Sequence, residues 1–205
     1  MKKILVAYTT NSGTTADVAA AVGEVLGSTG SLVEVRRLEE VTDLAPYAAV
    51  VVGGPMIMGW HRAAARFVRR HQAGLARVPV AYFFTARSLT RLGETDLDGV
   101  PVSVDPDLAK PPANPPRLSL RERYSTVKNY LRPVLRSAPR LRPVSVAFFG
   151  GRLNMAGMKL WQILFVVLVI QAKPGGTHNL PFIREWAAGL GEKFTAAGAP
   201  EGQAR

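Results

Sequence analysis

Cysteine is absent from this sequence, and its absence narrows the available chemistry. Without a thiol, the chain forms no disulfide, binds no metal through thiolates and has no cysteine nucleophile. The start of the chain also lacks a long apolar run. Residues 4–8 are apolar, which is shorter than the roughly 7–15 residues of a signal peptide core. We therefore expect a first strand there and a cytoplasmic protein.

Acidic residues are scarce in the middle of the chain. Between Lys110 and Arg142 there are nine lysines and arginines and one acid, Glu122, whereas the rest of the chain has 17 basic and 14 acidic residues. Such a basic surface favours phosphate, anionic lipid headgroups or a carboxylated ligand, and the alternative is a solvated face that only aids solubility. We expect no nucleic-acid partner, because the tract has only two aromatic residues, Tyr124 and Tyr130, and no RNA- or DNA-binding motif.

Apolar runs alternate with helical patterns along the chain. Five strands are predicted at 3–8, 31–36, 48–53, 78–85 and 143–150. Helices are predicted at 14–26 with Gly27 as a stop, at 61–71, from a capping box at Ser119 to an end or bend at Pro133, and at 181–195 with Asn179 near the start. The order predicts an α/β fold, a doubly wound five-stranded parallel sheet.

We expect a single domain over residues 1–198 followed by a disordered tail at 199–205. Within the domain, residues 86–118 are rich in proline and predict a long loop, and residues 152–180 contain an apolar insert. In such sheets ligands bind beyond the carboxyl ends of the strands, where the strand order reverses. This rule draws attention to three loops, 9–15, 53–60 and 85–91.

The first of these loops is unusually rich in small polar side chains. Thr9, Thr10, Asn11, Ser12, Gly13, Thr14 and Thr15 lie between the first strand and the first helix. Amides at a helix start hold an anion, and the hydroxyls and the glycine suit a phosphate monoester. The pattern is neither a P-loop nor a dinucleotide fingerprint, which disfavours ATP, GTP and NAD. The alternative is a polar turn that only caps the helix.

The second loop follows the third predicted strand and combines glycine with large apolar residues. Its sequence is Gly53, Gly54, Pro55, Met56, Ile57, Met58, Gly59, Trp60. A flat aromatic ligand needs apolar walls and backbone groups for its polar edge. The alternative is that these side chains fold back into the core. The position after the third strand favours the ligand.

Together, these features resemble a flavodoxin-type FMN domain. The shared features are the hydroxyl-rich first loop, the Gly-x-Pro-x-x-x-Gly second loop and the strand–helix order. The chain is also similar to the menaquinone-dependent protoporphyrinogen IX dehydrogenase family, because "VAFFGGRLN" precedes an apolar segment, a Gly-Gly turn and "FIREWA". Its Pro-rich loop and its Met-Ile-Met-Gly-Trp sequence depart from that family beside the expected substrate site.

The resemblance implies FMN as cofactor and assigns residues to it. Residues 9–15 are expected to hold the phosphate, Gly54–Trp60 to flank the isoalloxazine, and Thr85, Ala86, Arg87 and Ser88 to edge its pyrimidine side. The flavin would carry the redox chemistry, so we assign no catalytic side chain. Arg87, Arg91, Arg121 and Arg123 are candidates to bind substrate carboxylates, with solvated surface as the alternative. No metal site is expected, because neither the histidines nor the aspartates at 96, 98, 105 and 107 have a ligand spacing.

The apolar segment 160–172 carries no charge. As a helix its thirteen residues reach roughly 20 Å, short of the roughly 30 Å of a bilayer core, so a transmembrane span is rejected. The core, a second copy in a homodimer, or an anionic membrane surface could cover it. The last of these would place the protein peripherally at the inner face of the cell membrane.

Two functions follow from the resemblance. The first is an FMN-dependent oxidoreductase that passes electrons from a hydrophobic substrate, protoporphyrinogen IX or a similar molecule, to a quinone. The second is a flavodoxin-type electron carrier without a substrate of its own. Carriers of this fold are generally acidic, so the net charge of +11 favours the enzyme.

Overall fold

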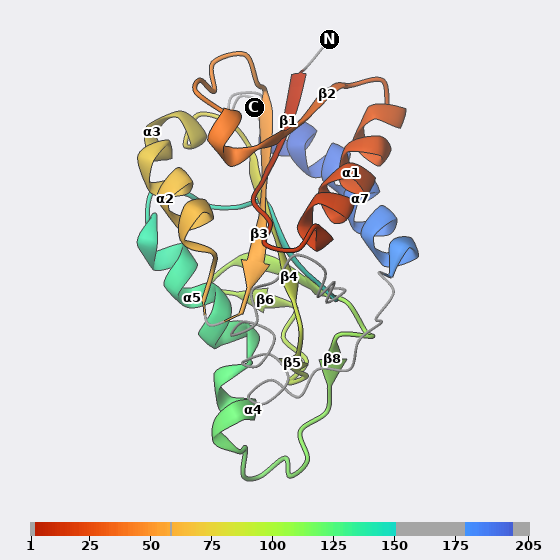
Figure 1. Cartoon of the computed structure of the whole chain (residues 1–205), viewed down its shortest axis with the longest axis vertical. Coiled ribbons are helices and arrows are strands. Elements are labelled where there is room, and N and C mark those ends of the chain that lie inside the picture. Colours follow the sequence, from red (N-terminus) through yellow and green to blue (C-terminus); the bar gives the residue numbers. More distant parts are fainter. Residues whose placement is uncertain (1–2, 58, 151–178, 199–205) are drawn as a thin grey trace, which may run out of the picture.

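A seven-stranded sheet forms the centre of the molecule (Figure 1). The computed structural model describes residues 3–57, 59–150 and 179–198. The strand order is β2-β1-β3-β4-β9-β7-β6. The strands are β1 Lys3–Tyr8, β2 Leu32–Arg37, β3 Ala49–Met56, β4 Val80–Ala86, β6 Asp96–Leu97, β7 Val100–Val104 and β9 Ser145–Gly150. All neighbours pair in parallel except β6, which is antiparallel to β7.

Helices cover both faces of this sheet. They are α1 Thr14–Ser28, α2 Arg62–Arg70, α3 Gln72–Leu75, α4 Leu120–Tyr124, α5 Val127–Ser137 and α7 Leu180–Ala197, with a 3₁₀ turn η1 at Leu38–Glu40. One face packs against α1 and α7, and the other against α2, α3 and α5 (Figure 1). Alternate residues of each strand enter the two cores, as in Val51 toward α1 and Val52 toward α2.

The α/β class and the doubly wound parallel sheet are confirmed, whereas the number of strands is larger than predicted. Residues 86–118 do not form one long loop. They contain β6 and β7, which extend the sheet beyond β9, and a separate two-stranded sheet of β5 Leu89–Thr90 and β8 Ala109–Lys110. The strands β5, β6 and β8 have two residues each, too few to form an apolar run in the sequence, and β7 is interrupted by Pro101.

Three helix boundaries also differ from prediction. Gly27 does not stop α1, which continues to Ser28. The helix expected from Ser119 to Pro133 is two helices, and Pro133 lies inside the second. The capping box of Ser119 and the cap at Asn179 are confirmed. The apolar segment 160–172 and the tail 199–205 fall outside the described residues.

The strand order reverses between β1 and β3, since β2 lies on one side of β1 and β3 and β4 lie on the other. Ligands of open α/β sheets bind at the carboxyl ends of the strands at this position. Across the described ranges, no helix combines the length and apolar character needed to cross a membrane.

Candidate functional site

The three loops singled out in the sequence meet at the carboxyl edge of β1, β3 and β4. The backbone N–H of Thr9 donates to the carbonyl of Gly53 over 3.1 Å, which joins the first loop to the second. The hydroxyls of Thr15 and Thr85 lie 2.9 Å apart, which joins the first loop to the third. One edge of the sheet therefore brings all three loops together.

The turn before α1 is open at its glycine. Gly13 is the N-cap of α1 and has φ +90°, a left-handed conformation that L side chains rarely adopt. A Cβ built at Gly13 would meet nothing within 4 Å. Gly13 has no side chain that could cap the helix, and the geometry of a helix start leaves first-turn amides such as that of Thr15 without an intrahelical acceptor. This helix end has the features of an anion site.

The hydroxyls of this loop divide into two sets. Thr9, Thr14 and Thr15 are buried, and the Thr15 hydroxyl is bonded to Thr85 beneath the turn. Thr10 Oγ1 accepts a hydrogen bond from the Gly13 N–H over 3.0 Å and so shapes the turn itself. Asn11 is exposed, and Ser12 is half-buried like Thr10. The backbone and two or three side chains, rather than five hydroxyls together, can face a phosphate.

The second loop is shorter than expected because β3 continues through Gly54 and Pro55 to Met56. The chain then turns back in a tight hairpin, with Met56 bridged to Trp60, Ile57 N–H bonded to the Gly59 carbonyl, and Gly59 at φ +114°. Met56 is buried in the core, whereas Ile57 is 44% exposed. Met56 therefore follows the core alternative. Met58 falls outside the described residues.

Trp60 folds onto the sheet rather than standing beside it. Its Nε1 would lie 2.9 Å from a Cβ at Gly54, so only glycine fits beneath the indole. The indole also contacts the rings of Tyr82 and Phe84, each at a centroid distance of 5.3 Å. In the described part of the chain, Trp60 Nε1 and the Tyr82 hydroxyl are buried polar atoms without a protein partner. Burial also raises the pKa of Tyr82, which stays protonated.

The third loop follows β4 and mixes buried and accessible residues. Thr85 and Ala86 are buried, whereas Arg87 and Ser88 are half-buried. Burial, and to a lesser degree the nearby charge of Arg121, lowers the pKa of the Arg87 guanidinium, which remains protonated at neutral pH. Two guanidinium groups near each other favour an anion between them.

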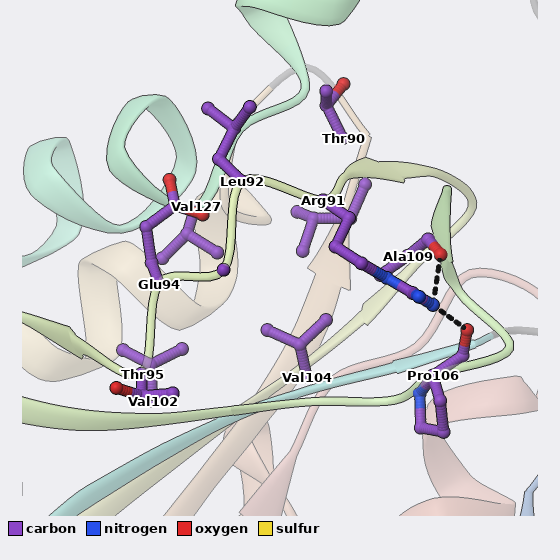
Figure 2. Close-up of a pocket in the computed structure, with 12 residues that line it drawn as sticks. Thr90, Arg91, Leu92, Glu94, Thr95, Val102, Val104, Pro106, Ala109 and Val127 are labelled. Carbon is purple, nitrogen blue, oxygen red and sulfur yellow. Dashed lines mark hydrogen bonds between the residues drawn. The ribbon is translucent and has the colours of Figure 1, made fainter. Parts of the chain in front are cut away.

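The other two candidate arginines lie farther along the same edge. Arg91 Nη2 donates to the carbonyls of Pro106 and Ala109, at 2.9 and 2.8 Å. Its stem lines a cavity of about 250 Å³ between β5, β7 and α5, whose walls are mostly apolar (Figure 2). Arg123 is exposed on α4. The structure thus places Arg87 and Arg121 near each other, but ties Arg91 to backbone carbonyls.

One polar cluster, centred on Asp105, was not predicted from the sequence. Asp105 is 1% exposed; its carboxylate accepts hydrogen bonds from Gly150 N–H at 3.0 Å and from Asn179 Nδ2 at 3.1 Å. The sequence placed Asp105 among four scattered aspartates and gave no sign that it joins the end of β9 to the start of α7. The residues described here contain no group of three or more side chains that could hold a metal ion.

The histidine of the second loop has a structural task. His61 Nδ1 accepts a hydrogen bond from Ala63 N–H over 3.2 Å and caps α2. Burial lowers the pKa of His61, so that the neutral ring is the form present near pH 7.

With this geometry established, comparison with known proteins identifies the family. A family model described as a flavodoxin domain matches residues 5–179. The chain belongs to the flavodoxin domain family. No curated protein sequence matches it.

Solved flavodoxins and a flavodiiron protein match most of the chain at low identity. A short-chain flavodoxin associated with a non-canonical PDU bacterial microcompartment is 10% identical, with 97% of this chain and 100% of that chain covered and a TM-score of 0.52. A flavodoxin from the domain Archaea is 14% identical, with coverages of 94% and 99% and a TM-score of 0.49. A flavodiiron protein from Giardia intestinalis is 15% identical, with coverages of 98% and 38% and a TM-score of 0.49. At these identities the likeness concerns the fold.

FMN is the cofactor of flavodoxin-like sheets, which hold it at the β1/β3 switch point. The described residues fit this cofactor at its phosphate end, because the uncapped start of α1 and the open space at Gly13 leave room for an anion. They also fit near the ring, where the orphaned Trp60 Nε1 lies over Gly54. The chain therefore has the parts needed at both ends of the site.

Proposed function

We propose that this protein is an FMN-dependent oxidoreductase that takes electrons from a hydrophobic substrate and passes them to a quinone. The observation that supports it is the open turn at Gly13 in front of the uncapped helix α1, at the switch point of a flavodoxin-type sheet. When bound, FMN supplies the one- and two-electron chemistry that no side chain of this chain provides.

The chain's own residues would bind the FMN and orient its ring. The amides of Thr14 and Thr15 and the side chains of Asn11 and Ser12 would hold the phosphate, with Thr10 keeping the turn in shape. The hairpin from Met56 to Trp60 would flank one side of the ring, with Ile57 the accessible apolar residue. Thr85 to Ser88 would border its polar edge.

Substrate binding is assigned to the third loop and the region beyond it. Arg87, half-buried and close to Arg121, would pair with a carboxylate of the substrate, since guanidinium groups match carboxylate geometry. Arg91 would hold the wall of the cavity of Figure 2 through its two bonds to backbone carbonyls. The apolar walls of that cavity suit a hydrophobic ring.

The second candidate is a flavodoxin-type electron carrier. The fold alone supports it equally, because the carriers of this family share the sheet and the phosphate turn. The basic charge of +11 and the cavity built by residues 89–127 support the enzyme, since a carrier needs neither.

Two experiments separate these functions. Purified protein should be yellow and release FMN on acid precipitation, and the flavin-loaded protein should catalyse anaerobic electron transfer from protoporphyrinogen IX to menaquinone. A colourless protein that cannot be loaded with FMN would refute both functions. A protein that binds FMN and exchanges electrons rapidly with other redox proteins, but does not turn over the substrate, would be an electron carrier.

A further inference from the structure

Helix α4 presents its apolar side to water. It buries none of its residues, and Leu120 and Tyr124 are 84% and 47% exposed. These two residues are four positions apart, so they lie on one face of the helix. A surface helix ordinarily turns such a face toward the core. An outward apolar face needs a different explanation.

The orientation of α4 is fixed by its polar side. Glu122 accepts hydrogen bonds from the N–H groups of Ser119 and Ala113, at 2.8 and 2.7 Å. Thr90 donates to the carbonyl of Glu122 at 2.9 Å through its hydroxyl and to that of Ser125 at 2.7 Å through its N–H. The carboxylate of Glu122, the only acid between Lys110 and Arg142, therefore bonds to exposed backbone N–H groups at Ala113 and Ser119, while Leu120 and Tyr124 remain exposed.

Cations surround this outward face. Arg121 and Arg123 flank Leu120 and Tyr124 on the helix itself, and Arg117 and Lys110 precede it; all four are exposed. Next to α4, the loop after β5 carries Leu92, which is 48% exposed and also lines the cavity of Figure 2. We call these exposed residues the α4 surface: Leu92, Lys110, Arg117, Leu120, Arg121, Arg123 and Tyr124.

We infer that the α4 surface docks onto an anionic lipid bilayer. Apolar side chains that enter the interface, surrounded by cations that meet headgroup phosphates, are the two attractions that hold peripheral proteins on membranes. An acidic protein would satisfy the cations but would leave Leu120 with no apolar surroundings. A nucleic acid would need aromatic residues for stacking, and this surface has only Tyr124.

The consequence is a defined orientation. Helix α4 lies at the same end of the molecule as the carboxyl edge of β3 and the β5–β8 sheet (Figure 1). Docking through α4 thus turns this end, together with the mouth of the cavity beside Leu92, toward the lipid. This inference needs no bound flavin, so it stands or falls separately from the redox function.

A single labelled cysteine tests insertion directly, because the natural chain has none. Full-length Leu120→Cys carrying an NBD label, prepared without added FMN, is mixed with vesicles of phosphatidylcholine alone or with 30% phosphatidylglycerol. We expect a blue shift and a several-fold rise in emission only on the anionic vesicles. The matched control is Leu32→Cys, since Leu32 is 52% exposed on the edge strand β2. No response at position 120, or an equal response at position 32, would overturn the inference.

Vesicle flotation then measures each attraction. Leu120→Ser should weaken binding roughly tenfold, and Arg121→Gln with Arg123→Gln about twenty-five-fold at low salt. The matched control is Arg69→Gln with Arg70→Gln, two exposed arginines of the last turn of α2, which should leave binding unchanged. Loss of binding in the charge variant alone, with Leu120→Ser unaffected, would indicate electrostatic adsorption without insertion of Leu120 and would overturn the inference.

Discussion

The loop after β1 and the loop after β3 meet at one edge of the sheet but are built in opposite ways. The first is open at Gly13 and offers backbone amides, whereas the second turns Met56 and most of Trp60 back into the core. A site made of backbone groups depends on local conformation, which sequence reveals through glycine and helix starts. A site made of side chains depends on which way each one points, which sequence does not reveal.

The strongest test of this contrast is removal of the indole from the second loop. Trp60→Ala should lower the free energy of unfolding of the FMN-free protein by about 3 kcal/mol, because the ring packs on Tyr82 and Phe84. Urea titration measures this change. The matched control is Ile57→Ala in the same hairpin, where an exposed side chain should change stability by less than about 0.5 kcal/mol. Equal effects of the two variants would mean that Trp60 does not belong to the core.

The first loop is tested through its glycine. Gly13→Ala should weaken FMN binding about tenfold, because a Cβ strains a residue at φ +90° and shifts the amides of the turn. Quenching of flavin fluorescence on binding gives the affinity.

Gly30→Ala is the control for backbone strain. Gly30 has φ +82° and equally open surroundings but lies between α1 and β2, away from the site. Gly30→Ala should be destabilised about as much as Gly13→Ala but should keep the FMN affinity of the unchanged protein. If both variants bind FMN alike, the turn at Gly13 does not hold the phosphate.

Breaking the hydrogen bond between Thr15 and Thr85, which lies under the first loop, should have a smaller effect. The quantity affected is the stability of the protein. Thr15→Val leaves the Thr85 hydroxyl without its partner in a buried position and should destabilise the protein by about 1–2 kcal/mol. Ser12→Ala, at a half-buried position in the same loop, is the control and should change FMN affinity more than stability. The double variant Thr15→Val with Thr85→Val should lose less than the sum of the single losses. Strict additivity would contradict the pairing.

The smallest expected effect concerns pH and the second loop. Burial lowers the pKa of His61 in the folded protein, so the neutral ring stabilises the fold above about pH 6.5, the ordinary value. As pH falls below that value, the unfolded chain binds the proton more readily and the free energy of unfolding decreases.

In His61→Asn, the asparagine should still cap α2 but does not titrate. The substitution should therefore remove the part of the pH dependence of the unfolding free energy that comes from His61, which is at most about 1 kcal/mol. Urea titrations of both proteins at pH 5.5 and 7.5 measure it. If the unfolding free energy changes between pH 5.5 and 7.5 by the same amount in both proteins, protonation of His61 does not affect the cap.

The sequence predicted well where structure follows local rules. The apolar runs of β1, β4 and β9 are continuous because these strands are buried on both faces, and the spacing of Val18, Val22 and Leu26 marks the buried stripe of α1. The caps at Ser119 and Asn179 depend only on neighbouring amides. The turn at Gly13 before α1 is likewise a local feature.

Prediction failed where structure depends on distant partners. Strands β5 and β8 have two residues each and pair with one another across about twenty residues, and β7 joins the sheet through β9, some forty residues later in the sequence. The inward turn of the Thr15 hydroxyl depends on Thr85, seventy residues away. The outward face of α4 could not be foreseen either, because an apolar pair four residues apart ordinarily indicates the core.

The bonds of Asp105 have a consequence for how this protein can vary. One buried carboxylate holds Gly150, where the chain leaves β9, and Asn179, where it enters α7. Two points that lie far apart in the sequence therefore depend on a single side chain. Replacing Asp105 would release the end of β9 and the start of α7 together, so a change at this one position acts on the sheet and on the last helix at once.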